Sequence, residues 1–505
     1  MIRVLRPTDG SLVGELAITP SRQVAGRVQK ARSVQAGWAS LSAKDRERRL
    51  RGLLASIGDR AKEIEDTIVA ETGKPKTEAT MEVTTVVDYL RYLLKNSTPF
   101  LRPKTISTGW MMWKRAFVQR EPMGVIGVIS PWNYPFILSM TPTATALFCG
   151  NGVVLKPSEF TPYSGLLVED IVRDAGLPEG LVQVIIGDGE TGEALVRGGV
   201  DKVFFTGGSK TGRAVLAAAA DNLTPVVMEL GGKDPAIVLE DADLARAARG
   251  IVWGAFLNAG QSCISVERVF VVEEIYDLFL RELLTQVHKV KAGSTPGVEV
   301  GPMTTTAQLD WVERQLADAL ERGANVVIGG TRTDPASNVL QPTVLTELGP
   351  ESSILREETF GPVLPVVRVK DAEEAISRAN EVRLGLSASV WTRDRSRGIS
   401  VARRLRAGAV CVNDAIVHFG IPALPFGGVG ESGFGRAHGV EGLEEMTRTR
   451  SILVDRLGLE REPWWFPYDR KTQRMLSGTL LARVKGGVRG LAAGVFHVLT
   501  GKRGS

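Results

Sequence analysis

Apolar residues in the first hundred positions recur at helical spacing. One series runs through Val24, Val28, Ala31, Val34 and Trp38, and another through Leu50, Leu53, Leu54 and Ile57. Steps of three and four residues place these side chains on one face of a helix, where they can pack against a core. The pattern therefore predicts a short strand at the start, then a helical region that continues through residues 82–95. Residues 112–121 indicate an extended segment that leads into Pro122.

From Gly124 onward, strand-like runs alternate with helical segments. The runs cover residues 125–129, 152–155, 182–186, 202–205 and 226–228, and those at 125–129 and 152–155 are continuously apolar. Continuous apolar strands are typical of parallel sheets covered on both faces, and crossover helices between them favour a doubly wound α/β fold. Ligands of such folds bind beyond the carboxyl ends of the strands.

The helix that follows residue 161 has recognisable end signals. Thr161 is a residue type that caps helices through its hydroxyl, Pro162 suits the first helical position, and Gly176 suits the terminator. We therefore expect a helix between Pro162 and Gly176, capped by Thr161.

A second series of alternating elements follows Cys263. It includes helices near 274–290 and at 371–380, and strand-like runs at 269–272, 324–328, 363–369 and 408–412. The series predicts a second α/β domain. No internal repeat at solenoid periods is visible.

Composition is ordinary for a globular protein of about three domain-sized units, with 505 residues, 43% hydrophobic and 24% charged. No secretory signal is expected in residues 1–17, because they mix charges with a short apolar run, and no spanning helix is predicted. The net charge of +5 is unevenly distributed: residues 470–505 carry eight basic and no acidic side chains, so residues 1–469 carry −3. No nucleic-acid partner is expected.

The three cysteines, Cys149, Cys263 and Cys411, are far apart and odd in number, so they imply a reducing compartment rather than a disulfide framework. Cys149 and Cys411 lie in apolar runs and are expected to pack in the core. The four histidines are scattered without metal-ligand spacing, and no metal site is expected. The expected location is cytoplasmic.

Cys263 lies behind a run of small and polar residues, Gly260, Gln261 and Ser262. A thiol becomes a nucleophile when it is partly exposed and nearby dipoles or donors favour its thiolate. These neighbours leave room for a substrate and supply hydrogen-bonding groups. A small buried thiol at a loop-to-strand junction is the alternative, and this stretch alone is equally compatible with both.

Three further stretches place chemical groups at strand ends. Residues 205–212 run from a strand into a helix through several glycines, a weak signal for a phosphate site that a plain turn also explains. Lys156 and Glu159 could hold ribose hydroxyls, or lie in a solvated loop. Glu229 ends a strongly apolar strand, where a carboxyl should have a raised pKa, as a general base requires. A surface acid is the alternative.

Seven spaced motifs together make the chain resemble the aldehyde dehydrogenase superfamily over residues 10–455. They are residues 131–135 (PWNYP), 156–159 (KPSE), 205–207 (FTG), 229–233 (ELGGK), 260–263 (GQSC), 357–362 (EETFGP) and 425–428 (PFGG). The resemblance favours the nucleophile interpretation of Cys263 over the packing one.

The resemblance implies a mechanism for these residues. Cys263 would attack an aldehyde carbon to give a thiohemiacetal, while the Asn133 amide and the Cys263 backbone N–H hold the oxyanion. Hydride transfer would leave a thioester, which water activated by Glu229 would hydrolyse. The cofactor would be NAD, with NADP as the alternative, because the Glu159 carboxylate repels a 2′-phosphate.

The resemblance also implies which residues bind the cofactor. Lys156 and Glu159 would contact the adenine ribose, and Glu358 the nicotinamide ribose. Phe360 would pack beside the nicotinamide. The remaining expected contacts are Trp132, Gly207, Gly208 and Gly212. Two positions depart from the family pattern: Gly208 stands where many members have serine, and Arg448 where many have a second pocket glutamate.

The implied fold is α/β and has three parts. These are a Rossmann-like NAD-binding domain (1–102 and 123–231), a catalytic domain (232–433) and a small β oligomerisation region (103–122 and 434–468) of a homodimer or homotetramer. Residues 469–505 form a basic amphipathic tail. Its apolar stripe runs through Leu476, Leu480, Val484, Val488, Leu491, Val495 and Leu499. The tail could pack on a partner subunit or rest on an anionic membrane surface.

The substrate is left open between two classes. Residues 412–418, 424–430 and 438–439 look like the class 3 and fatty-aldehyde branch, whereas residues 261–268 are closer to bacterial semialdehyde dehydrogenases such as those for succinic semialdehyde. A non-catalytic descendant of the fold should have lost Cys263, Glu229 or Asn133. A CoA-acylating enzyme typically lacks the general base, so Glu229 argues against it.

Overall fold

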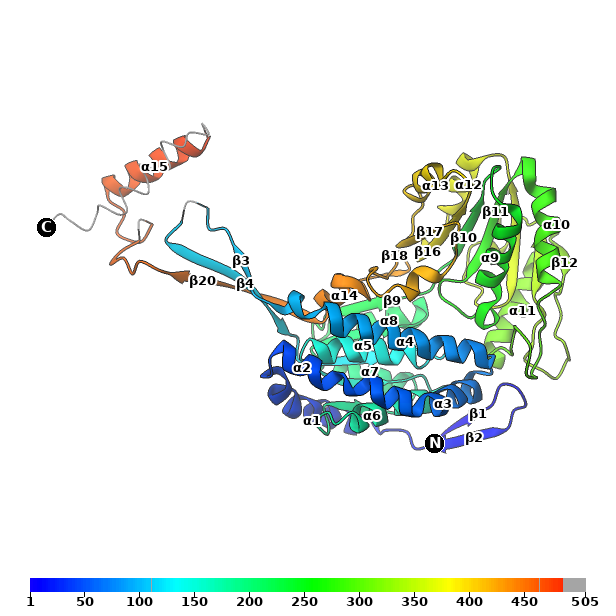
Figure 1. Ribbon diagram of the computed structural model, residues 1–505, viewed down its shortest axis with the longest axis horizontal. Helices are drawn as coiled ribbons and strands as arrows, with labels where there is room; N and C mark the ends of the chain where they lie inside the picture. Colours follow the sequence, from blue (N-terminus) through cyan, green and yellow to red (C-terminus); the bar gives the residue numbers. More distant parts are fainter. Residues whose placement is uncertain (110, 463, 485–505) are drawn as a thin grey trace. The chain divides into compact units, whose positions relative to one another are not determined.

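The computed structural model describes residues 1–109, 111–462 and 464–484. The chain forms two compact units (Figure 1). The larger contains Met1–Phe100 and Pro122–Arg448, and the smaller contains Leu101–Glu121 and the described residues of Thr449–Ser505. Both sheets that carry the predicted chemistry lie in the larger unit.

The first sheet of the larger unit has six strands in the order β19-β9-β8-β5-β6-β7. Its strands are β5 (Val125–Ile129), β6 (Gly152–Lys156), β7 (Val182–Val184), β8 (Lys202–Thr206), β9 (Val226–Glu229) and β19 (Gly433–Phe434). The five from β5 to β9 are parallel, and β19 pairs antiparallel with β9. In chain order this is the 3-2-1-4-5 arrangement of a doubly wound fold. The parallel sheet predicted from the apolar runs is therefore present.

Helices cover both faces of this sheet. They are α1 (Ser21–Ala39), α2 (Ala43–Leu50), α3 (Gly52–Thr72), α4 (Lys76–Asn96), α5 (Ile137–Phe148), α6 (Pro162–Asp174), α7 (Gly189–Arg197) and α8 (Ser209–Ala220). One core joins α1, α7 and α8 to the strands through side chains such as Val28, Leu195 and Val203. The chain starts with a hairpin of β1 (Ile2–Leu5) and β2 (Leu12–Leu16). The predicted N-terminal helices are confirmed.

Helix α6 begins differently from the sequence prediction. Thr161 occupies the N-cap position, but its hydroxyl makes no capping hydrogen bond. Instead, the buried carboxylate of Glu71 on α3 accepts hydrogen bonds from the backbone N–H groups of Tyr163 (2.7 Å) and Ser164 (2.9 Å). The cap therefore comes from a distant helix, where a carboxylate also complements the helix dipole. Gly176, with φ of +71°, follows the helix end as predicted.

The second sheet has seven strands in the order β12-β13-β14-β11-β10-β16-β17. Its strands are β10 (Asp234–Val238), β11 (Val266–Val272), β12 (Asn325–Ile328), β13 (Thr343–Thr346), β14 (Val363–Val369), β16 (Ser387–Trp391) and β17 (Ala409–Val412). Only β12 is antiparallel to its neighbour. The predicted second α/β layer is present, with β10, β13 and β16 added to the strands expected from sequence.

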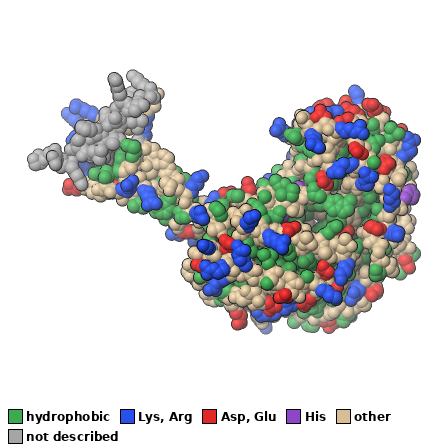
Figure 2. Space-filling view, in the orientation of Figure 1, with side chains coloured by type: hydrophobic (Ala, Val, Ile, Leu, Met, Phe, Trp, Pro, Cys, Tyr) green, Lys and Arg blue, Asp and Glu red, His purple; other side chains and the backbone are tan. Residues whose placement is uncertain are grey.

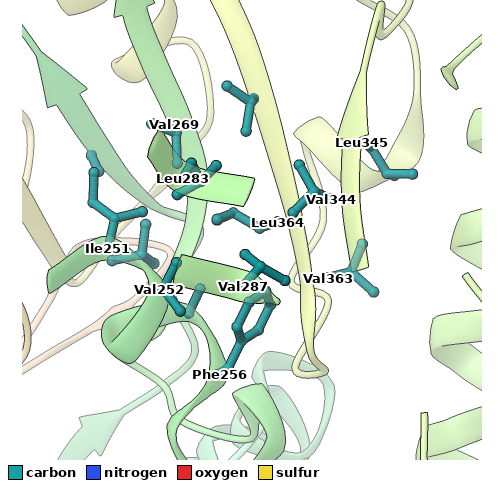
Figure 3. Close-up of a cluster of buried hydrophobic side chains, with 14 of the residues drawn as sticks. Ile251, Val252, Phe256, Val269, Leu283, Val287, Val344, Leu345, Val363 and Leu364 are labelled. Atoms are coloured by element: carbon teal, nitrogen blue, oxygen red, sulfur yellow. The ribbon is translucent and has the colours of Figure 1, made fainter. Parts of the chain in front are cut away.

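The core of this part lies between its sheet and helices (Figure 3). The helices are α9 (Leu244–Phe256), α10 (Tyr276–Val287), α11 (Thr306–Glu321), α12 (Ala372–Ala379) and α13 (Arg395–Ala402). Ile251 and Phe256 of α9 and Leu283 of α10 face Val269 of β11 and Leu364 of β14. Short elements complete the larger unit: η1 (Thr98–Leu101), η2 (Leu257–Gly260), η3 (Glu273–Ile275), η4 (Ser353–Leu355), η5 (Val417–Gly420), β15 (Leu384–Gly385), β18 (Val429–Gly430) and α14 (Gly439–Glu445).

The smaller unit is built on a three-stranded sheet in the order β20-β4-β3. The hairpin of β3 (Lys104–Ile106) and β4 (Lys114–Pro122) and the strand β20 (Thr447–Asp455) are close to the predicted ranges. Lys114 forms ion pairs with Asp455 and Glu462. Helix α15 (Arg470–Val484) follows, and the apolar stripe predicted beyond Val484 lies outside the described residues.

The surface of the protein carries both signs of charge interspersed with apolar side chains (Figure 2). Among the described residues, no helix is long and apolar enough to cross a membrane. In the same residues, no group of three or more His, Cys, Asp and Glu side chains is placed to hold a metal ion. Cys149 and Cys411 are buried, as predicted.

Candidate active site

The carboxyl ends of four parallel strands bring the predicted site residues to one edge of the six-stranded sheet. The chain leaves β5 toward Trp132 and Asn133, β6 ends at Lys156, β8 ends just before Gly207, and β9 ends at Glu229. The strand order changes direction between β5 and β8, which is where doubly wound folds bind ligands.

Asn133 is held in place by a buried hydrogen-bond network. Its side-chain amide donates to the Gln261 carbonyl (3.0 Å), and its own carbonyl accepts from the Asn258 amide (2.9 Å) and the Lys74 ammonium (2.8 Å). Lys74 is itself paired with Glu82 (2.9 Å). One amide hydrogen of Asn133 remains for another acceptor. Sequence reasoning missed Lys74, Glu82 and Asn258.

The backbone before Cys263 turns sharply. Asn258 and Ala259 have left-handed backbone angles, with φ of +54° and +55°, and Gly260 has φ of +71°. A Cβ on Gly260 would lie 2.2 Å from the Gly361 carbonyl, so only glycine fits there. The turn brings the Cys263 loop close to the segment that carries Glu358 and Phe360.

Cys263 is half-buried, but its surroundings disfavour the thiolate. Desolvation raises the pKa of the thiol well above its usual value, and the carboxyl groups of Glu358, Asp234 and Glu229 raise it further. In the protein without ligands these surroundings therefore favour the protonated thiol. Removal of the thiol proton must be coupled to the reaction itself.

Glu229 is buried at the end of β9, and neither carboxyl oxygen accepts a hydrogen bond from the described residues. The nearby Ala437 N–H donates to the Phe426 carbonyl instead (2.7 Å). Burial raises the pKa of Glu229 well above 4.5, against a lowering influence of Arg436. The raised pKa predicted for this carboxyl is confirmed.

Two cavities meet at Cys263. One, of about 30 Å³, is lined by Cys263, Glu229 and His438 among others. The other, of about 280 Å³, is largely apolar, with Met81, Leu138, Trp253, Ile416 and Phe419 in its walls. Among the described residues that line the larger cavity there is no lysine, arginine or histidine. The thiol therefore lies between a small pocket that contains a carboxyl group and an apolar chamber.

Lys156 and Glu159 lie together at the end of β6. The Lys156 ammonium is 3.3 Å from the Glu159 carboxylate, and Ser158 also contacts that carboxylate (3.5 Å). Gly208 stands at the N-cap of α8 with open space around its Cα. At Gly212 a Cβ would lie 2.7 Å from the Leu230 side chain, so glycine permits close packing of α8 on the sheet.

Glu358 lies against the glycines that follow β9. Its carboxylate accepts a hydrogen bond from the Gly232 N–H (3.2 Å), and a Cβ on Gly231 would lie about 2 Å from it. Burial and the neighbouring Glu267 raise the pKa of Glu358 to about 8. The close approach of Glu358 explains why glycine stands at position 231, two residues after the end of β9.

Phe360 is placed by a second buried network. Lys233 donates to Glu267 (2.7 Å) and Thr359 (2.8 Å), and Glu267 accepts from the Phe360 N–H (2.9 Å). The Phe360 ring meets Trp132 edge-on at 5.4 Å. Of the predicted residues, Glu229 lines a cavity together with Cys263, and Glu358 lies near enough to raise the pKa of its thiol. Lys156, Glu159 and Gly208 lie apart from the two cavities.

Comparison with known proteins agrees with this geometry. Residues 1–452 match the model of the aldehyde dehydrogenase family. The chain belongs to the aldehyde dehydrogenase family. It is an NAD(P)-dependent enzyme that oxidises an aldehyde, and the predicted α/β Rossmann-like fold is confirmed.

Two relatives and one solved structure illustrate the similarity. The 4,4′-diapolycopene aldehyde oxidase of Methylomonas sp is 42% identical over 482 residues, 95% of this chain and 90% of that protein. The mitochondrial succinate-semialdehyde dehydrogenase of Oryza sativa subsp. japonica is 33% identical over 463 residues, which are 90% of this chain and 86% of that protein. The structure of the Mycobacterium tuberculosis aldehyde dehydrogenase complexed with NAD+ superposes with a TM-score of 0.85 at 33% identity. The superposition covers 90% of this chain and 94% of that chain.

Proposed function

We propose that this enzyme oxidises large apolar aldehydes to carboxylic acids, with Cys263 as the nucleophile. The observation that carries the substrate class is the apolar cavity of about 280 Å³ beside Cys263, which has no basic side chain among its described lining residues. Its two acids, Glu78 and Glu82, offer no positive charge to a substrate carboxylate. Burial raises the pKa of Glu78 to about 7. A succinic semialdehyde would need a cation to replace the water lost by its carboxylate.

Lys74 contacts the cavity-lining residues Glu82 and Tyr134, but its charge is not available to a substrate. Its ammonium is bonded to Glu82 and to the Asn133 carbonyl, and it lies over the Tyr134 ring at 4.2 Å. The side chain is buried. Its charge is therefore already neutralised by the protein.

A second hollow continues from the apolar cavity. It has a volume of about 540 Å³ and shares Glu78, Met81, Trp253 and Leu257 with the first, and the basic residues Arg249 and Lys289 lie in its outer wall. A hydrocarbon chain too long for the inner cavity could pass between Met81 and Trp253 into this hollow. This continuity supports a long aldehyde, the class named in the Methylomonas relative, over the short one named in the rice relative.

The catalytic roles follow the positions of three groups. Cys263 bonds to the aldehyde carbon while its thiol proton passes to the Glu229 carboxylate, which lines the same small cavity. The oxyanion accepts hydrogen bonds from the Cys263 N–H and the remaining amide hydrogen of Asn133. After hydride has left the carbon and Glu229 has released the first proton to solvent, Glu229 takes a proton from the water that attacks the thioester. Its raised pKa suits a base working near neutral pH.

The residues at the strand ends fit a dinucleotide. Lys156 and Glu159 supply a donor and an acceptor for ribose hydroxyls, and the N-terminus of α8 at Gly208, which has no side-chain cap, suits a phosphate. We assign Gly207 and Gly212 to the same region. We assign Glu358, Phe360 and Trp132 to the nicotinamide end. When bound, NAD(P) accepts the hydride. The Glu159 carboxylate favours NAD over NADP.

An aldehyde panel tests the substrate class. We expect kcat/KM to rise from hexanal to dodecanal and to be at least about 100-fold lower for succinic semialdehyde, the factor for an unpaired buried charge. The variant Leu138→Arg should reverse part of this preference, and Leu138→Met should not. A wild-type preference for succinic semialdehyde would refute the proposal.

We further propose that the enzyme is a homodimer or homotetramer assembled through the smaller unit, and that the larger unit divides at about residue 231 into cofactor and catalytic domains. Ile106, Leu453 and Val454 are exposed on the three-stranded sheet, which supports a partner surface there. Light scattering of the wild type and of Leu453→Asp tests the assembly. A monomeric wild type would exclude it.

We also propose that the enzyme is cytoplasmic and that its C-terminal segment rests on an anionic membrane surface. Exposed Trp465, Phe466 and Tyr468 precede α15, and residues 470–505 carry only basic charge. Aromatic rings next to basic residues are typical of interfacial segments. Flotation with anionic vesicles at low salt should recover the full-length protein but not a version ending at Tyr468. Equal failure of both would leave only a packing role.

A further inference from the structure

Two buried polar side chains without partners line the same small cavity. The cavity of about 30 Å³ contains Glu229 and His438 in its wall. Neither carboxyl oxygen of Glu229 has a hydrogen-bond partner among the described residues, and the Nδ1 atom of His438 has none there either. Buried polar atoms in native proteins are nearly always satisfied, and when the protein supplies no partner a water usually does.

The cavity has the size for that water. A volume of about 30 Å³ corresponds to one water molecule. Three other polar side chains in its wall are already engaged. The Tyr89 hydroxyl bonds to Thr145 (2.6 Å), Thr145 donates to the Thr141 carbonyl (2.8 Å), and Thr141 donates to the Ile137 carbonyl (2.8 Å). The fully buried side-chain atoms without a partner in this wall therefore belong to Glu229 and His438.

The orientation of His438 is fixed by its neighbours. Its ring lies 4.8 Å from the rings of Tyr89 and Phe419 and 6.1 Å from that of Phe426. It stands at the N-cap of α14 with φ of +59°. Burial lowers the pKa of His438 to about 3, so the ring stays neutral and does not compete for a proton. A neutral imidazole with its proton on Nε2 offers one acceptor, Nδ1.

From this arrangement we infer that His438 is a positioning residue for thioester hydrolysis: its Nδ1 and the Glu229 carboxylate hold one water between them, next to Cys263. The inference rests on the proposed roles of Glu229 and Cys263. The water donates one O–H to each anchor, which turns an oxygen lone pair toward the acyl carbon on the sulfur. Two anchors restrict the water more than Glu229 alone could.

The step balances as follows. Glu229 takes the proton of the O–H that points to it, the water oxygen bonds to the thioester carbon, and the carbon–sulfur bond breaks. The sulfur leaves with the electron pair and receives the proton from Glu229, so the products are a carboxylic acid and the Cys263 thiol. His438 gains and loses no proton.

Hydrolysis of 4-nitrophenyl acetate tests this inference without cofactor or aldehyde. The first turnover measures acylation of Cys263 as a burst of 4-nitrophenol, and the later rate measures hydrolysis. His438→Phe keeps a ring of similar size but removes the nitrogen. We expect its burst to stay at about one per Cys263 and its later rate to fall about tenfold, the effect of one lost hydrogen bond to the reacting water.

Two further variants complete the design. His438→Gln returns a polar atom and should recover the later rate to within about threefold of wild type. His418→Phe removes the neighbouring buried histidine, whose Nδ1 contacts Cys411 (3.4 Å) and which does not line this cavity, and should leave both phases unchanged. A later rate of His438→Phe within twofold of wild type, loss of its burst, or no recovery in His438→Gln would each overturn the inference. Failure of wild type to oxidise any aldehyde would instead refute the proposed function.

Discussion

Replacement of Lys74 by methionine should destabilise the larger unit severely. Lys74 and Glu82 form an ion pair of 2.9 Å whose side chains are 1% and 0% exposed. Glu82 also accepts hydrogen bonds from the N–H groups of Phe136 (2.9 Å) and Ile137 (3.1 Å) at the start of α5. Lys74→Met would leave the Glu82 charge buried with only these two donors. Breaking such a pair costs about 3 to 5 kcal/mol.

Urea unfolding followed by tryptophan fluorescence measures this cost. The matched control is Lys62→Met, which removes an exposed pair with Asp66 (2.6 Å, 83% and 49% exposed) and should leave the free energy of unfolding nearly unchanged. The double variant Lys74→Met with Glu82→Gln removes both charges and should recover to within about 2 kcal/mol of wild type. If Lys74→Met is no more destabilising than Lys62→Met, the buried pair does not make the predicted contribution to the free energy of unfolding.

The other predictions concern chemistry, cofactor and pH. Cys263→Ala should abolish aldehyde oxidation, whereas Glu229→Gln should give a first-turnover burst of NADH followed by slow hydrolysis; full steady-state activity in either variant contradicts the assigned roles. Because the pKa of Glu229 is raised, the hydrolysis rate of wild type should increase with pH through that pKa, and the residual rate of Glu229→Gln should not. Glu159→Gln should weaken a preference for NAD over NADP, since the carboxylate repels a 2′-phosphate by about one to a few kcal/mol; more efficient use of NADP by wild type would refute the assignment. Burial raises the pKa of Glu71 from 4.5 to about 7. Between these pKa values the folded state keeps a proton that the unfolded state loses. The free energy of unfolding of wild type should therefore fall by about 3 kcal/mol relative to that of Glu71→Gln as pH rises from 4.5 to 7. Urea denaturation of both proteins at pH 4.5 and pH 7 measures the direction of this change.

The sequence was sufficient where one local pattern determines one structure. Residues 125–129 and 203–205 are continuously apolar, so burial on both faces follows from them directly. The strands β13 and β16 are fully buried as well, but they contain Thr343, Ser387 and Ser389, and their burial depends on the layers packed around them. A short window of sequence does not contain that information.

In the candidate site, too, some residues were predictable from a local motif and others depend on contacts between distant parts of the chain. Glu229 and Cys263 stood out because each lies in a motif next to a strand. Lys74 lies 59 positions from Asn133, and Asn258 lies 125 positions from it, yet both bond to its carbonyl. No periodicity connects these residues. The same holds for Glu71 and the helix it caps, where Thr161 was the reasonable local choice.

The carboxyl groups around Cys263 also bear on how the enzyme withstands oxidants. Peroxides attack the thiolate of a cysteine far faster than the protonated thiol. Because desolvation, and after it the carboxyl groups of Glu358, Asp234 and Glu229, raise the pKa of Cys263, the resting sulfur keeps its proton. We therefore expect the free enzyme to form sulfenic acid at Cys263 slowly when it is exposed to peroxide.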